Sequence, residues 1–90
     1  MYELYIRRRA EKFLNHTDPP DRDRIVKAIL ELAEDPRPHG CEKLMDDIYR
    51  IRVGPYRVIY LIDDTTREVD IGKVDRRKER TYKDLRTLFR

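Results

Sequence analysis

The sequence predicts a small α+β fold: an N-terminal strand, a two-helix hairpin, a three-stranded antiparallel meander and a C-terminal helix, in the order β-α-α-β-β-β-α. Three observations predict it. Apolar side chains alternate at the N-terminus, recur twice with helical spacing, and then fill three strand-like runs separated by turn residues. The 90 residues suit one domain and are too few for two, so we expect a single domain over residues 1–90.

The first half of the chain predicts a strand and two helices. Residues 2–6 alternate as a short strand does, and residues 10–14 have the apolar spacing of an amphipathic helix that ends near His16. Asp18 stands before two prolines, and a second helix is expected to begin there. The residue before proline avoids helical backbone angles, as an N-cap does, and proline fits the first helical turn. An apolar stripe marks this helix until residues 35–36 end it.

The second half predicts the meander. Residues 36–44 are expected to form a loop. Three strand-like runs follow this loop: residues 48–53, 56–62 and 68–74. Turn-forming residues separate consecutive runs, which favours antiparallel pairing between neighbours.

The C-terminal residues predict a final helix. Leu85, Leu88 and Phe89 have helical spacing. Thr81 and Asp84, just before them, fit a capping box, which satisfies the first backbone N–H groups of a helix.

Charge and composition limit the classes of function. Charged residues make up 43% of the chain and hydrophobic residues 39%, which predicts a folded unit with a heavily charged surface. The net charge of +3 lies entirely in residues 46–90, where twelve basic residues outnumber nine acidic ones, and this indicates an anionic partner. The single cysteine allows no internal disulfide. With no signal peptide and no apolar run long enough to span a bilayer, we expect a cytoplasmic protein with no membrane partner.

Strand parity brings three arginines together. Residues two apart on a strand point to the same side, so Arg50 and Arg52 share a face. If Gly54 and Pro55 form a two-residue hairpin loop, Arg52 lies directly opposite Arg57, with Cβ atoms roughly 5 Å apart. Opposed like charges destabilise a sheet, but the arginine fork binds phosphate through two parallel hydrogen bonds. We call Arg50, Arg52 and Arg57 the arginine patch and predict that it binds RNA phosphates.

The basic residues also have a simpler interpretation. Alternating arginines are often only the solvated face of a half-buried sheet. The basic run after the last predicted strand, at Arg76, Arg77, Lys78 and Arg80, is commonly solvated as well. If the end of that strand instead brings Arg77 and Tyr82 to the rim of the patch, Tyr82 offers an aromatic face on which a base of single-stranded RNA stacks.

The sequence contains no motif that is typical of a metal site or a cofactor site. His16 and His39 lie in the first half, away in sequence from the arginines, and no cluster of His, Cys and Asp has metal-ligand spacing. No glycine-rich phosphate loop is present. Asp46 and Asp47 are adjacent and would point to opposite sides of a strand. We therefore expect no metal and no cofactor.

Two segments resemble a known family. They are Tyr49–Asp63, with the sequence YRIRVGPYRVIYLID, and Asp75–Leu85, with the sequence DRRKERTYKDL. Together with the order of elements and the length, they resemble the RelE/ParE superfamily of toxins, and RelE-type mRNA interferases in particular. The resemblance implies a type II toxin that binds a cognate antitoxin. It also implies a ribosome-dependent endoribonuclease that cuts mRNA in the A site without metal, with mRNA and ribosomal RNA as partners. In such enzymes the ribose 2′-hydroxyl attacks the neighbouring phosphate.

The resemblance implies roles for individual residues as well. Arg52 and Arg57 would stabilise the negative charge of the transition state, Arg77 would contact the phosphate near the leaving 5′-oxygen, and Tyr82 would stack on or orient the base. The other basic residues would bind RNA: Arg50, Arg76, Lys78 and Arg80. The apolar side chains of the final helix would contact the antitoxin: Leu85, Leu88 and Phe89.

Departures from the family pattern leave alternatives open. Some relatives carry lysine where this chain has Arg50 and Arg52, and arginine is much harder to deprotonate, so the general base is unassigned. Met45 and Pro55 stand where the family often has a glycine and an acidic residue. ParE-type relatives keep the fold and inhibit DNA gyrase without chemistry, and an inactive relative would bind RNA or the ribosome only. The presence of Arg57 with the basic and tyrosine residues after it favours the nuclease.

Overall fold

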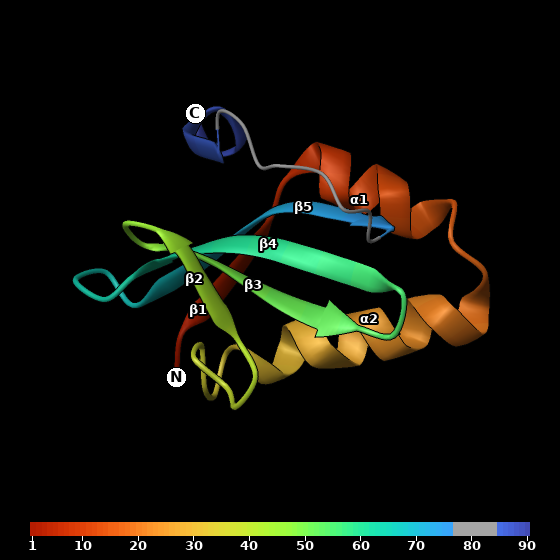
Figure 1. Cartoon of the computed structure of the whole chain (residues 1–90), viewed down its shortest axis with the longest axis horizontal. Helices are drawn as coiled ribbons and strands as arrows, with labels where there is room; N and C mark the ends of the chain where they lie inside the picture. The colour runs from red at the N-terminus through yellow and green to blue at the C-terminus, as the bar shows by residue number, and fades with distance from the viewer. Residues whose placement is uncertain (77–84) are drawn as a thin grey trace.

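The computed structural model describes residues 1–76 and 85–90 and has the predicted α+β architecture (Figure 1). Its elements are β1 (Glu3–Ile6), α1 (Arg8–Asn15), α2 (Pro19–Glu31), β2 (Glu42–Met45), β3 (Ile48–Val53), β4 (Tyr56–Asp63), β5 (Glu68–Arg76) and η1, a 3₁₀ helix (Leu85–Phe89). The second helix begins after Asp18 as predicted, with prolines in its first turn. It ends at Glu31 rather than at Asp35, because the chain passes there into tighter turns.

The five strands form one sheet in the order β1-β5-β4-β3-β2. The predicted meander of β3, β4 and β5 forms its centre with antiparallel pairing, and β1 adds to β5 in parallel. The loop expected over residues 36–44 is wrong in its last part, because Glu42–Met45 forms β2 and pairs with β3. This strand is four residues long, and its apolar residues do not alternate, so pairing with β3 rather than its own pattern creates it.

Both helices pack on one face of the sheet and bury the main core. Inward-facing side chains of β3, β4 and β5 meet Ala10 and Leu14 of α1 and Ile25 and Ile29 of α2. Tyr60, at the centre of β4, is fully buried and donates a hydrogen bond from its hydroxyl to the carbonyl of Pro36 (2.7 Å). The core therefore leaves the other face of the sheet available for the C-terminal residues and the arginines.

The C-terminal helix η1 packs on that other face. Leu85 joins Ile48 and Ile59 in a second, smaller apolar cluster. The side chain of Arg7 donates hydrogen bonds to the backbone of the last two residues. Its Nη1 donates to the carbonyl of Arg90 (2.5 Å) and its Nη2 donates to the carbonyl of Phe89 (2.9 Å). The predicted final helix is thus present as five residues of 3₁₀ helix, and its predicted capping pair, Thr81 and Asp84, lies outside the described residues.

Gly72 provides the space for the ring of Phe89. A Cβ atom at position 72 would lie 2.5 Å from Cε1 of Phe89, which is closer than real contacts allow. We expect Gly72→Ala to displace the ring and to lower the free energy of unfolding by about 1–3 kcal/mol, the usual cost of overpacking. Urea denaturation would measure this loss. Adding Phe89→Leu should restore part of it, and equal stability of Gly72→Ala and wild type would contradict the packing described.

None of the helices in the described part of the chain is both long enough and apolar enough to cross a membrane.

Candidate nucleic-acid interface

The hairpin of β3 and β4 confirms the predicted register. Val53 pairs with Tyr56 and Arg52 pairs with Arg57, so the loop between the strands is Gly54-Pro55. Gly54 has a φ of +58°, the positive value that the first position of this loop requires. The arginine patch therefore lies on one face, the face that the two helices leave uncovered.

Arg57 is held by Asp75, a partner that the sequence did not predict. Its Nε donates to Oδ1 of Asp75 (2.6 Å) and its Nη2 donates to Oδ2 of the same carboxylate (3.2 Å). The Arg57 side chain is 8% exposed and that of Asp75 is 20% exposed. The carboxylate of Asp75 on β5 lies directly opposite Arg57. It partly compensates the repulsion between the two positive charges of Arg52 and Arg57.

A bulge in β5 decides that Asp75 faces Arg57. The register between β4 and β5 shifts at Gly72, so that Ile59 pairs with Lys73 and Tyr60 with Ile71. Without the shift, the register set by Asp63 and Glu68 would place Asp75 opposite Tyr56, on the face against the helices. A bulge is hard to foresee, although a glycine within the predicted strand is the signal that could have indicated one.

The other two arginines of the patch differ in their surroundings. Arg50 forms an ion pair with Glu42 on β2, and its side chain is 11% exposed. Arg52 is exposed, and no acidic side chain among residues 1–76 and 85–90 forms an ion pair with it. Strand β2, which the sequence did not predict, thus supplies the partner of Arg50.

Arg76 lies on the opposite face from the patch. Arg76 was predicted to follow the last strand, but β5 extends through Arg76, which pairs with Tyr56. Its Nη1 donates to the Tyr56 hydroxyl (3.2 Å), and that hydroxyl donates to Oδ2 of Asp21 (2.9 Å). The hydrogen bond from Tyr56, followed by one from Arg24, lowers the pKa of Asp21, while the Asp21 carboxylate raises the pKa of the Tyr56 hydroxyl. Arg76 therefore belongs to the helix side, and the structure does not bring it together with the arginine patch.

The remaining predicted site residues that follow Arg76 lie outside the described residues: Arg77, Lys78, Arg80 and Tyr82. Their roles stay predictions. The same holds for any contribution of Tyr82 to the rim of the patch.

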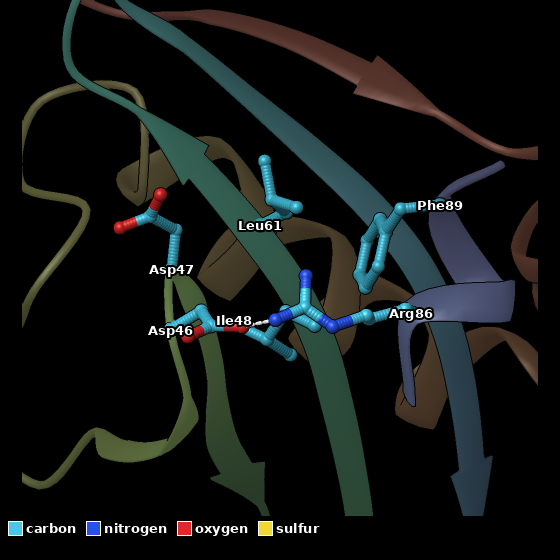
Figure 2. Close-up of a pocket in the computed structure, with 6 residues that line it drawn as sticks. All are labelled: Asp46, Asp47, Ile48, Leu61, Arg86 and Phe89. Carbon is cyan, nitrogen blue, oxygen red and sulfur yellow. Dashed lines mark hydrogen bonds and ion pairs between the residues drawn. The ribbon is translucent and has the colours of Figure 1, made fainter. Parts of the chain in front are cut away.

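The three apolar residues predicted to contact an antitoxin pack against the sheet. Leu85 is buried, and Leu88 and Phe89 pack partly buried against the same cluster. Beside them lies a shallow hollow lined by residues of the β2–β3 turn, β3, β4 and η1 (Figure 2): Asp46, Asp47, Ile48, Leu61, Arg86 and Phe89. Figure 2 shows Arg86 reaching from η1 to an ion pair with Asp46. The hollow is partly apolar and partly charged. The contact of Leu85, Leu88 and Phe89 with an antitoxin stays a prediction.

Within the residues that the structure describes, no group of three or more His, Cys, Asp or Glu side chains is arranged to hold a metal ion. The arginines of the described site can bind anions and stabilise negative charge.

Comparison with known proteins gives the family. The sequence profile of the ParE toxin of type II toxin–antitoxin systems matches residues 4–81. The chain belongs to the RelE/ParE superfamily. No match was found among the curated protein sequences compared.

Solved structures place this toxin near the RelE type. The toxin in the E. coli RelBE toxin–antitoxin complex is 29% identical, with a TM-score of 0.75, covering 88% of this chain and 100% of that one. The chain matched in the RelBE2 complex of Mycobacterium tuberculosis is 26% identical, with a TM-score of 0.73, covering 84% of this chain and 98% of that one. The archaeal RelE–RelB complex from Pyrococcus horikoshii has a TM-score of 0.76 at 24% identity, covering 88% and 98%, and supports the fold alone.

Proposed function

We propose that this toxin is a metal-independent endoribonuclease that cuts mRNA in the ribosomal A site, in the cytoplasm, and that a cognate antitoxin neutralises it. One observation carries the proposal: Arg52 and Arg57 lie directly opposite each other at the end of a hairpin, on the sheet face that α1 and α2 do not cover. The E. coli and M. tuberculosis structures similar to this chain are complexes with antitoxins, which supports the partner.

The proposed reaction moves the phosphorus from the 5′-oxygen of one nucleotide to the 2′-oxygen of the preceding ribose. The ribose 2′-hydroxyl gives up its proton to water and attacks the adjacent phosphorus, the bond from phosphorus to the 5′-oxygen breaks, and that oxygen takes up a proton from water. The products are a 2′,3′-cyclic phosphate and a 5′-hydroxyl. Negative charge builds up on the phosphate oxygens between these events, where the guanidinium groups of Arg52 and Arg57 would stabilise it. Arg77 is proposed to act near the leaving oxygen and Tyr82 on the base.

A second function, inhibition of DNA gyrase by binding, is favoured by two observations. The profile that matches residues 4–81 is that of ParE toxins, and the Arg57 side chain is paired with Asp75 in the structure rather than presented to solvent. A gyrase inhibitor needs no cleavage site, so the pairing of Arg57 with Asp75 would not lower its activity.

Pulse labelling separates the two functions. We expect that expression of the toxin without its partner stops incorporation of labelled methionine within minutes, while incorporation of thymidine continues. A matched variant, Arg24→Ala, removes an exposed arginine on α2 and should arrest translation as wild type does. If thymidine incorporation stops first and protein synthesis continues, the gyrase function is correct. If translation stops but primer extension shows no new mRNA ends in purified ribosomes, the protein binds without cutting.

A further inference from the structure

The arginine patch carries its own counter-ions. Asp75 on β5 binds Arg57 through both carboxylate oxygens, and Glu42 on β2 forms an ion pair with Arg50. The two acids come from the strands that flank the hairpin on either side. Arg52, between them, is exposed. The central hairpin therefore supplies the positive charges, and its neighbours supply two negative ones.

The pairing of Asp75 with Arg57 uses the same geometry that a phosphate would use. A carboxylate and a phosphate both bind a guanidinium through two parallel hydrogen bonds to two oxygens. Two anions at one guanidinium also repel each other, and near a protein surface this repulsion is stronger than in bulk water. A phosphate that approaches Arg57 must therefore compete with Asp75.

Asp75 and Glu42 differ in how strongly each competes with a phosphate for its arginine. The side chain of Asp75 is 20% exposed, whereas that of Glu42 is 56% exposed and better screened by solvent. Lys73 offers Asp75 a second cation, because its Nζ lies 3.5 Å from Oδ2. Asp75 can leave Arg57 without losing all its charge compensation, so the exchange for a phosphate is feasible.

We propose that Asp75, and to a lesser degree Glu42, is a resident counter-ion that RNA phosphates must displace from the arginine patch. The identity of the polyanion as RNA rests on the proposed function, whereas the competition itself does not. This competition keeps the affinity for isolated phosphates low. It favours a partner that delivers several phosphates at once, because contacts with the exposed Arg52 then compensate for the displacement.

Asp75→Asn tests the competition, because asparagine keeps a hydrogen-bond acceptor and loses the charge. Two probes are titrated by calorimetry: sodium tripolyphosphate and a single-stranded 2′-deoxy oligonucleotide, which cannot be cut. Relative to wild type, we expect Asp75→Asn to bind both probes about tenfold more tightly, because the variant removes a negative charge that repels the phosphates. For the oligonucleotide, the slope of log affinity against log salt should steepen by about 0.7 for each additional phosphate that the variant neutralises.

Matched controls separate competition from a general gain of positive charge. Glu68→Gln changes the charge equally, at the other end of the same strand and on the same face, and should alter affinity less than twofold. In an Arg57→Gln background, Asp75→Asn should have no larger effect on affinity than Glu68→Gln.

Circular dichroism shows whether each variant is folded. If Asp75→Asn does not fold, Glu42→Gln, at an exposed side chain, should tighten binding of both probes through Arg50.

The results decide the proposal independently of cleavage. Tighter binding of tripolyphosphate by the folded variant supports the competition even if the toxin never cuts RNA. Equal or weaker binding of both probes by folded Asp75→Asn, or the same increase in affinity in Glu68→Gln, would overturn it.

Discussion

Replacing Arg57 with alanine should lower single-turnover cleavage of A-site mRNA by roughly 10²–10³, the scale observed when one preorganised donor to a transition state is removed. Arg57 is the best fixed arginine of the patch, since Asp75 and the strand register determine its position. Binding to the ribosome should weaken far less, because Arg52 and the other basic residues still supply salt-dependent attachment.

Binding and single-turnover cleavage are therefore measured side by side on purified programmed ribosomes. Arg24→Ala, an exposed arginine on the helix side, is the matched control and should leave both unchanged. Equal proportional loss of binding and cleavage in Arg57→Ala would show that Arg57 only anchors the phosphate backbone. Tyr82→Phe, assayed in parallel, should retain activity if the ring only stacks and should lose it if the hydroxyl transfers a proton.

Tyr60→Ala should lower the free energy of unfolding by about 3–5 kcal/mol, as truncation of a fully buried aromatic side chain does. Tyr60 is 0% exposed, and its ring stacks on that of Tyr49, with centroids 6.1 Å apart. Its hydroxyl also satisfies the carbonyl of Pro36. Since small domains are stable by about 5–15 kcal/mol in total, this single change removes a large share.

Urea denaturation measures this loss, and two further variants divide it into parts. Tyr60→Phe removes only the hydrogen bond and should cost about 1–3 kcal/mol, because the buried carbonyl of Pro36 loses its partner. Tyr5→Ala, at a side chain that is 49% exposed on β1, should change stability by less than about 0.5 kcal/mol. A similar loss in Tyr5→Ala and Tyr60→Ala would contradict the burial pattern.

Local features of the sequence were sufficient for most of the fold. Helix starts depend on a few neighbouring residues, so Asp18 and its prolines were enough to place α2. The register of the β3–β4 hairpin depends on a two-residue loop and on strand parity, so Gly54 and Pro55 were enough to oppose Arg52 and Arg57. Both features act within a few residues along the chain.

Tertiary structure decided what the arginines contact. The sequence by itself determined the strands of the meander, the face they share and the three arginines on it, because alternation and loop length are local. Only the folded sheet determined that Asp75 faces Arg57, that Glu42 reaches Arg50 and that Arg76 points away to Tyr56. Those three outcomes depend on a bulge at Gly72 and on the pairing of a strand too short to show a pattern. Both are set by contacts between residues distant in the chain, and no local pattern records them.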